Sequence, residues 1–433
     1  MNKGNKVYNQ AKNFILGGTM LFSKRPELYL PKYWPSYFSK AKNIEVWDLE
    51  GKKYTDMICA VGQSTLGYTN SEVDNEVCKY IKKGNMTSLN CSEEVTLAKK
   101  LIKMHPWSDM AKFARSGGEA NAIAIRIARS AAKKDKVAIC GYHGWHDWYL
   151  SANLKKNNLN QHLLPGLSPK GVPESLRNTV YTFNYNDFDA LDKIVRKNEI
   201  GVIKMEVARG SLPNIDFLKE VRKLANKKKI ILIFDECTSG FRRNFGGLHL
   251  TTGVEPDLAM FGKALGNGFA ITSVIGKKKI MNAAAESFIS STFWTERIGY
   301  VAANITLDIM EREKTWKKLI ESGKLLNNEW RKLSEKYNLN LKISGIESIT
   351  SFQFRQDLNL YFKTFITQEM LKMNYLASNL VFVTTKHTKK IILQYIHSLD
   401  KIFNKLSKID TVTEIKSLLK GPVCHATFKR LVD

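Results

Sequence analysis

A buried apolar run that ends in two acids is the feature that most constrains this fold. Residues Ile230 to Phe234 are apolar, and Asp235 and Glu236 follow them directly. A continuous apolar run of this length is typical of a parallel strand that is buried on both faces. Open α/β sheets bind their ligands outside the carboxyl ends of such strands. The pattern therefore predicts an α/β fold in which Asp235 lies at a ligand site.

A second short apolar run, Leu258 to Phe261, is followed by Gly262 and Lys263. The glycines that follow in the run Gly266 to Gly268 let the backbone pass close to another group. If both runs are strands of one parallel sheet, an acid and a lysine face the same cleft. The alternative to a functional site is that Asp235 is an acid of the core and Lys263 is a surface lysine beside a flexible loop.

The stretch from Phe113 to Lys134 contains a helix with an apolar stripe. Ser116, Gly117 and Gly118 stand immediately before the stripe. Small residues at a helix start leave backbone N–H groups free at the positive end of the helix dipole, which is a ready phosphate site. The alternative is an ordinary helix cap. The stripe repeats at helical spacing through these residues: Ala120, Ile123, Ala124, Ile127, Ala128 and Ala131.

Two further strands are expected between this helix and the central strand. Val137 to Cys140 is followed by GYHGWHDWYL, in which His143 and His146 stand three apart. No third ligand is placed to complete a metal site with them, so none is predicted. The strand Gly201 to Met205 ends in Glu206, and a helix from Asp216 to Lys227 leads to the central strand. This alternation predicts a parallel sheet with right-handed crossovers.

The ends of the chain predict a second, smaller α/β domain. Two alternating runs around Glu50-Gly51 indicate a hairpin over Ile44 to Ile58. The expected domains are an arm and hairpin at 1–60 that contribute to the small domain, a large domain at 61–320, and the rest of the small domain at 321–433. The further elements expected are helices Glu72–Lys82, Glu93–Met104, Leu325–Tyr337, Thr364–Met373 and Lys389–Lys405, strands Leu341–Phe354 and Asn379–Thr384, and a long polar loop Leu154–Arg177.

Composition narrows the class of protein. The 433 residues are 43% hydrophobic and 25% charged, which is ordinary for a globular protein. The net charge of +26 is spread along the whole chain, so a solvated surface that steers anionic small molecules is favoured over a nucleic-acid groove. The six cysteines form no CxxC pair and predict neither a zinc site nor a disulfide framework. No apolar run is long enough to cross a membrane, and we expect a cytoplasmic protein.

Five motifs resemble those of one enzyme family. SGGEA, YHG, DECTSGFR, GKALGNG and the STF loop occur in order at family-like spacing. Together they resemble the class III aminotransferases that depend on pyridoxal phosphate (PLP), and most closely the branch that contains glutamate-1-semialdehyde aminomutase. The resemblance implies a fold-type-I transferase with a large PLP-binding domain, a mostly parallel sheet and a small α/β domain, working as a homodimer with shared active sites.

The resemblance also implies roles for particular residues. Lys263 would form a Schiff base with the cofactor, and Asp235 would pair with its pyridine nitrogen and keep it protonated. Gly118 stands where the family usually has Ser or Thr. The glycine removes one hydroxyl donor from the phosphate-binding site at the helix start. Thr292 corresponds to a residue that reaches the cofactor phosphate of the partner subunit. The other cofactor-binding positions implied are Ser116, Gly117, Tyr142, which would stack on the ring, His143 and Glu206.

The implied activity is transfer of an amino group from an amino-acid donor to a carbonyl acceptor. GGxxxxSKRP at Gly17 to Pro26 and STFWTER at Ser291 to Arg297 resemble a branch found with surface-polysaccharide and amino-sugar genes. The alternatives are glutamate-1-semialdehyde 2,1-aminomutase and, as non-enzymes, a cofactor-binding regulator or a basic nucleic-acid binder. STFWTERIG departs from the Gly-Thr-Leu-Ser-Gly-Asn-Pro typical of the aminomutases. Arg297 would either bind an anionic substrate group or cap its helix, and Lys24 or Arg25 would have to replace the family's arm arginine.

Overall fold

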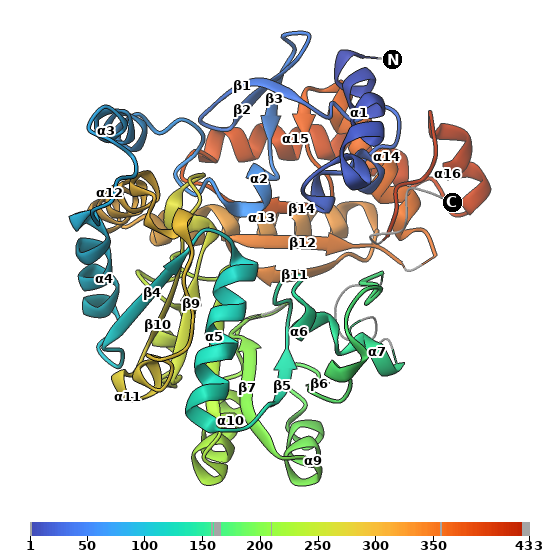
Figure 1. Cartoon of the computed structure of the whole chain (residues 1–433). Coiled ribbons are helices and arrows are strands. Elements are labelled where there is room, and N and C mark those ends of the chain that lie inside the picture. The colour runs from blue at the N-terminus through green and yellow to red at the C-terminus, as the bar shows by residue number, and fades with distance from the viewer. Residues whose placement is uncertain (1, 157–158, 160–165, 209, 356, 427–433) are drawn as a thin grey trace. The chain divides into compact units, whose positions relative to one another are not determined.

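The computed structural model describes residues 2–156, 159, 166–208, 210–355 and 357–426. The chain divides into two compact units (Figure 1). The large unit comprises Ser71–Trp316, and the small unit comprises Met1–Asn70 together with Lys317–Asp433. These divisions fall after Asn70 and after Trp316, whereas the sequence-based boundaries are at residues 60 and 320.

The large unit contains one sheet with helices on both faces. Its helices are α3 (Ser71–Ile81), α4 (Ser92–Met104), α5 (Gly117–Ala132), α6 (Asp147–Leu150), α7 (Asn153–Lys156), α9 (Phe188–Lys197), α10 (Ile215–Lys228), α11 (Lys278–Asn282) and α12 (Arg297–Glu313). Its strands are β4 (Met110–Ala114), β5 (Lys136–Cys140), β6 (Val180–Thr182), β7 (Ile200–Glu206), β8 (Ile231–Glu236), β9 (Leu258–Phe261) and β10 (Thr272–Gly276). Short 3₁₀ turns are η4 (Glu174–Leu176), η5 (Leu248–Thr251), η6 (Lys263–Gly266) and η7 (Thr292–Thr295).

The sheet of the large unit is mostly parallel, as the sequence predicts. Its strand order is β4-β10-β9-β8-β7-β5-β6. The strands from β9 to β6 run parallel, and β10 runs antiparallel to both β9 and β4. Glu206 at the end of β7 is in register with Asp235 at the end of β8. Two acids therefore end neighbouring strands at the carboxyl edge, where open α/β sheets bind ligands.

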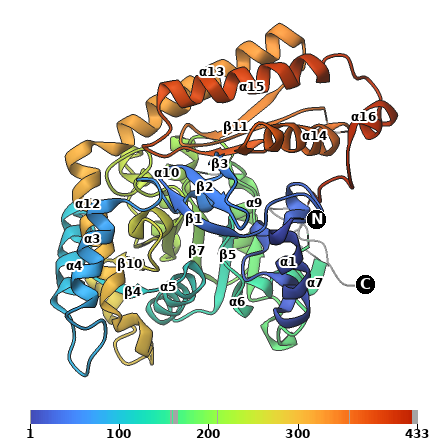
Figure 2. The ribbon, with the colours of Figure 1, turned by 90° about the horizontal axis from the view of Figure 1, so that it is seen from above.

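Two apolar layers explain why the central strands are continuously apolar. Side chains of a strand alternate between the faces of a sheet, so both faces need a cover. One face packs against α5, and the other packs against α9 and α10, which lie across the strands from α5 (Figure 2). The α5 face of β8 contributes Ile231 and Ile233, and the opposite face contributes Leu232 and Phe234. Burying each of these large side chains contributes about 1.5–3 kcal/mol.

The small unit is built from both ends of the chain. Its first part contains α1 (Lys3–Phe14), the turns η1 (Leu16–Gly18), η2 (Phe22–Lys24) and η3 (Pro26–Leu28), strands β1 (Phe38–Lys42), β2 (Glu45–Asp48) and β3 (Lys53–Asp56), and α2 (Cys59–Gly62). Its second part contains β11 (Lys342–Ile346), β12 (Ile349–Gln353), α14 (Asn359–Lys372), β13 (Tyr375–Leu376), β14 (Leu380–Phe382), α15 (Lys389–Leu406) and α16 (Val412–Leu418), preceded by α13 (Thr315–Tyr337). The predicted hairpin is β2–β3, and β13 from the second part pairs parallel with β3.

The single strand expected over Leu341–Phe354 is wrong. The segment is a hairpin of β11 and β12, with Ile346 opposite Ile349. Gly345 adopts φ +108°, and a Cβ there would lie 2.1 Å from the carbonyl oxygen of Ile349. The two turn residues, Glu347 and Ser348, are not the Asn-Gly or Asp-Gly pair that signals a tight hairpin, so the reversal is not evident from the sequence. Within the ranges that the structure describes, no helix has the length and apolar character needed to span a membrane.

Candidate active site

Asp235 is the buried centre of the site in the large unit. Its side chain is 4% exposed, and its Oδ2 lies 2.8 Å from Nδ1 of His143. The same Oδ2 lies 3.6 Å from Nζ of Lys204, whose side chain is fully buried. The backbone N–H of Cys237 donates to Oδ1 at 3.1 Å. Three groups that favour a negative charge therefore surround this carboxylate.

These neighbours decide the charge of Asp235. Burial alone would raise the pKa of its carboxyl, but the charge of Lys204 and the hydrogen bond from His143 lower the pKa to about 2. Burial lowers the pKa of His143, so its imidazole is neutral and donates Nδ1–H to Asp235. The result is an ionised carboxylate, held in a fixed orientation, at the end of β8.

Lys263 begins η6, separated from β9 by Gly262, in a strained backbone conformation. Its φ is +43°, which costs a non-glycine residue about 1–3 kcal/mol. Its Nζ donates to Oγ1 of Thr238 at 2.8 Å. Burial, together with the nearby charge of Arg242, lowers the pKa of the Lys263 amine. A lowered pKa raises the fraction of unprotonated amine, which is the nucleophilic form.

The start of α5 lies beside the Lys263 loop. A Cβ on Gly117 would lie 3.6 Å from Sγ of Cys237, and a Cβ on Gly262 would lie 2.9 Å from the same sulfur. Ser116 is the N-cap of α5 and forms a capping box with Glu119. The structure therefore brings together the helix start, the end of β8 and the lysine loop, as expected from the sequence.

The loop after β5 places Tyr142 and His143 next to the two strand-end acids. The backbone N–H of Tyr142 donates to Oε2 of Glu206 at 3.1 Å. Gly141 adopts φ +124°, and a Cβ there would lie 2.7 Å from the same Glu206 oxygen. Of the two tryptophans that follow Tyr142, Trp148 packs in the α5-side core and Trp145 is 68% exposed.

In the structure, Arg297 is paired within the protein and is not free to bind an anionic substrate group. Its guanidinium binds both carboxylate oxygens of Glu93, at 3.0 and 2.9 Å, and lies 4.5 Å from the ring centroid of Tyr80. The residue that precedes α12 as its N-cap is Glu296. Arg297 thus fastens the start of α12 to α4.

Three other features expected from the sequence are Thr292, the long polar loop and Arg25. Thr292 begins η7 and is exposed on the large unit. The long polar loop expected over Leu154–Arg177 includes residues 157–158 and 160–165, which lie outside the described residues. In the small unit, the guanidinium carbon of Arg25 lies 3.7 Å from the ring centroid of Phe22.

Sequence reasoning missed Lys204 and Thr238. A lone lysine inside the apolar strand GVIKME was a usable signal, because a lysine is almost never fully buried unless it is paired. Its partner could not be read from the sequence. Thr238 lies within the DECTSGFR motif, but only the structure shows that its hydroxyl meets Lys263.

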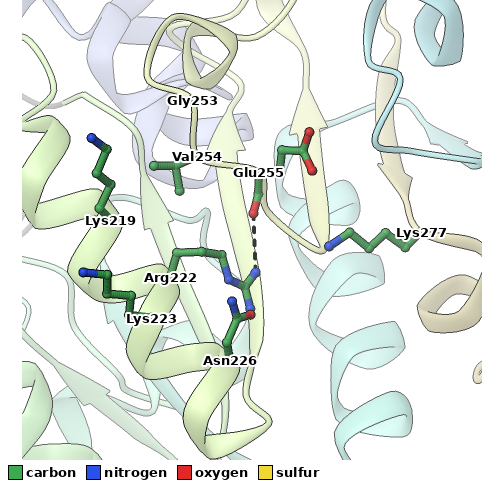
Figure 3. A pocket seen from close by; sticks show the side chains of 8 residues that line it. All are labelled: Lys219, Arg222, Lys223, Asn226, Gly253, Val254, Glu255 and Lys277. Atoms are coloured by element: carbon green, nitrogen blue, oxygen red, sulfur yellow. Dashed lines mark hydrogen bonds between the residues drawn. The ribbon is translucent and has the colours of Figure 1, made fainter.

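A surface hollow of about 390 Å³ lies away from these residues (Figure 3). It is lined by α10, by the segment before β9 and by Lys277, which follows β10. Arg222 and Lys277, two of its cations, both pair with Asp257 at 2.9 and 3.0 Å. The hollow is thus at the amino-terminal edge of β8 and β9, opposite the edge that carries Asp235.

On the face of β8 opposite α5, Glu236 is the centre of a second buried network. Its Oε1 lies 2.7 Å from Nδ1 of His249, and its Oε2 accepts from the hydroxyl of Ser239. Nε2 of His249 accepts from the indole N–H of Trp107 at 2.9 Å, and His105 stacks on the His249 ring. Nε2 of His105 accepts from the backbone N–H of Gly247. This network fixes the chain that follows β8.

Comparison with known proteins identifies the family. The family model for class-III aminotransferases matches residues 31–397. The 3-aminobutyryl-CoA aminotransferase of Cloacimonas acidaminovorans (strain Evry) is 35% identical over 361 residues, which cover 81% of this chain and 83% of that protein. The chain belongs to the class-III aminotransferases.

Other class-III relatives agree with this assignment. The glutamate-1-semialdehyde 2,1-aminomutase of Methanosphaera stadtmanae is 29% identical over 425 residues, covering 95% of this chain and 98% of that protein. The FumI protein of Sphingopyxis sp. MTA144, solved with PLP, has a TM-score of 0.85 at 24% identity and covers 94% of this chain and 97% of that one. The fold is accordingly that of the fold-type-I PLP-dependent transaminases, as the sequence predicts.

The cofactor of this class-III aminotransferase is PLP, and the site fits it. An ionised carboxylate suits a protonated ring nitrogen, and a lysine amine of lowered pKa suits an aldehyde. The N-terminus of α5 suits a phosphate, because Gly117 and Gly118 present first-turn amides that meet no partner in the described part of the chain.

A double-mutant cycle can measure the coupling energy between Lys204 and Asp235. Lys204→Met keeps an unbranched, slightly shorter side chain but leaves Asp235 without its counter-charge, so we expect a loss of about 3 kcal/mol in the free energy of unfolding. Lys204→Met combined with Asp235→Asn should cost less than the sum of the single changes, by about 1 kcal/mol. Urea unfolding of the apoenzyme measures this. Exposed Lys219→Met, the matched control, should change stability by less than about 0.5 kcal/mol. Strict additivity would contradict the coupling.

His105 should make stability depend on pH. Burial lowers its pKa from 6.5 to about 4, so the unfolded chain takes up the proton first as the pH falls. The contribution of His105 is therefore present above pH 6.5 and is lost as the pH falls towards 4. Between about pH 7 and about pH 5 the loss should be about 2 kcal/mol. Urea unfolding of wild type and His105→Gln at both pH values measures it, and an equal loss in both proteins would contradict the assignment.

Proposed function

We propose that this class-III aminotransferase moves an amino group between separate donor and acceptor molecules, with Lys263 and Asp235 as its catalytic residues. The observation that carries the proposal is the buried Asp235 carboxylate, held ionised at the sheet edge beside the Lys263 loop. Bound PLP supplies an electron sink for the substrate carbon that loses its proton. The intact acid and lysine favour an enzyme over a cofactor-binding regulator or a nucleic-acid binder.

The residues of the site have distinct roles in this proposal. Asp235 keeps the ring nitrogen protonated, and His143 and Lys204 keep Asp235 ionised. The Lys263 amine holds the cofactor aldehyde and, once released by the substrate, carries a proton from or to the substrate carbon. The remaining cofactor-binding positions are Ser116, Gly117 and Gly118 at the phosphate, and Tyr142 at the ring, with Glu206 fixing the Tyr142 backbone.

The loop before α12 supports transfer between molecules over the internal transfer of the aminomutase. The Arg115 guanidinium donates to the backbone carbonyls of Phe293 and Trp294, at 2.7 and 2.9 Å. Arg297 is paired with Glu93. Both arginines at this loop are thus used by the protein, so the loop that stands in place of the aminomutase sequence Gly-Thr-Leu-Ser-Gly-Asn-Pro offers neither of them to a substrate.

The nature of the acceptor is a further part of the proposal. Phe293 and Trp145 are 65% and 68% exposed and flank the start of α5. Aromatic faces bind uncharged ring systems such as sugars, which supports an amino-sugar or surface-polysaccharide product. The 35% identical relative is named for an amino acyl-CoA compound, and the matching 3-oxoacyl-CoA, which has a carbonyl where that compound has its amino group, is the second candidate acceptor.

The activity test separates transferase from mutase. We expect L-glutamate alone to remove the visible absorbance of the bound cofactor, and a keto-sugar or a 3-oxoacyl-CoA to restore it with formation of an amino product. Glutamate semialdehyde should give little aminolevulinate. Rapid aminolevulinate formation would contradict the proposal, and a Lys263→Ala control should form no product in either assay.

The lysine assignment can be tested by chemical labelling. Borohydride reduction of the holoenzyme should fix the cofactor on Lys263, the lysine whose buried amine meets Thr238. Peptide mapping by mass spectrometry locates the label. Lys263→Ala should lose the label and Lys277→Ala should keep it. A label on any other lysine would show that the site is misplaced.

We infer a homodimer with shared active sites, acting in the cytoplasm. The Ser116 hydroxyl is engaged with Glu119 in the capping box, so α5 offers the phosphate mainly backbone amides. A dianion has more acceptor positions than these amides fill. Thr292 is exposed in η7 and is available to a partner subunit. It would supply a hydroxyl to the phosphate bound by that partner.

Subunit complementation tests the shared site. Thr292→Glu should prevent cofactor binding by placing like charge against the phosphate, and Lys263→Ala should be inactive for lack of the amine. A refolded mixture should regain activity, because each heterodimer contains one site with both residues intact. Thr295→Glu, in the same turn, should keep activity by itself. A mixture that exchanges subunits but stays inactive would rule out sharing through Thr292.

A further inference from the structure

The start of α5 is short of side-chain donors for a phosphate. The hydroxyl of Ser116 donates to Oε2 of Glu119 at 3.0 Å and accepts from the Glu119 backbone N–H at 3.3 Å. The next two residues, Gly117 and Gly118, have no side chains. Phosphate oxygens bind most strongly to several donors at once, and here the first turn offers two backbone amides.

The space that a side chain at position 118 would fill is occupied by an imidazole. A Cβ built on Gly118 would lie 2.7 Å from Cε1 and 2.9 Å from Nδ1 of His146, and 3.3 Å from Nε1 of Trp145. The His146 ring is stacked on the Trp145 ring, with centroids 4.4 Å apart. The histidine therefore stands against the helix start in a fixed orientation.

Two details show that this close approach is built into the loop. Gly144 adopts φ +95°, and a Cβ there would lie 3.1 Å from the Cα and 3.8 Å from the amide nitrogen of Gly118. A side chain at either glycine would separate the loop from the helix start. Nδ1 of His146 is buried, yet it has no hydrogen-bond partner among the described residues. A buried polar nitrogen without a partner is costly, unless a ligand supplies one.

We propose that His146 is a cofactor-binding residue whose Nδ1–H donates to the phosphate of PLP, in place of a side chain at position 118. The inference rests on the proposed phosphate position at the start of α5. Burial lowers the pKa of His146, so the ring is neutral before the cofactor binds, and a neutral imidazole can still donate from Nδ1. Trp145 holds the ring against Gly118 by stacking.

The test compares the binding of PLP with that of pyridoxal, which lacks the phosphate. His146→Phe keeps a planar ring against Trp145 but removes both nitrogens. We expect it to raise the Kd of PLP on the order of tenfold, the loss of one hydrogen bond to a charged group. The Kd of pyridoxal should stay unchanged. An equal loss for both compounds, or no loss for either, would overturn the proposal.

Exchange of the two positions gives a second, independent measurement. Gly118→Ser alone should weaken PLP binding, because its Cβ collides with the His146 ring. In the His146→Ala background, Gly118→Ser has room and supplies a hydroxyl, so it should restore most of the PLP affinity lost by His146→Ala. His146→Gln, which keeps an N–H donor, should lose less affinity than His146→Phe. No gain from Gly118→Ser in the His146→Ala protein would count against a donor role.

These measurements are equilibrium binding to the apoenzyme, so they do not depend on turnover. A protein that binds PLP as proposed but transfers no amino group would contradict the proposed function and leave this inference intact. A wild-type protein that binds PLP no more tightly than pyridoxal would overturn the phosphate position and this inference with it.

Discussion

The ionised carboxylate of Asp235, buried in the large unit, is the constraint on which the site depends. A carboxylate removed from water loses its hydration, and that cost must be offset by charges and hydrogen bonds. Lys204 supplies the charge from β7, and His143 supplies a hydrogen bond from the loop after β5. Both partners are themselves fully buried, so each depends on Asp235 as much as it depends on them. The order of the strands is what brings these residues together.

The sequence predicted the elements of the large unit well because their periodicities are strong. The apolar runs of β8 and β9, the stripe of α5 and the acids that end β7 and β8 all lie where expected. Side-chain partners between elements were beyond such reasoning. The pairing of Lys204 with Asp235 requires the register of two parallel strands, and sequence spacing does not contain that register. The β11–β12 hairpin was missed because its turn residues, Glu347 and Ser348, carry no strong turn signal.

Glycines decide how closely the segments of the site approach one another. Gly118 has no side chain, and this lets Gly144 and His146 from another loop lie close to it. From the sequence alone, a glycine at this position is only the loss of a hydroxyl donor. In the structure, the imidazole of His146 can lie against the helix start only because residue 118 is a glycine. Any side chain at position 118 would displace the ring. A departure from a family pattern can thus be one half of a paired change.

The adjacent acids Asp235 and Glu236 show how one strand end serves two purposes. Consecutive side chains of a strand point to opposite faces of the sheet. Asp235 meets His143 and Lys204, while Glu236 binds His249, Ser239 and the backbone amides of Leu248 and His249. The Glu236 network holds the chain that follows β8, and that chain carries Thr238, which meets Lys263. A substitution of Glu236 would therefore act on the Lys263 amine through backbone position, although Glu236 itself faces away from the α5 side of the sheet.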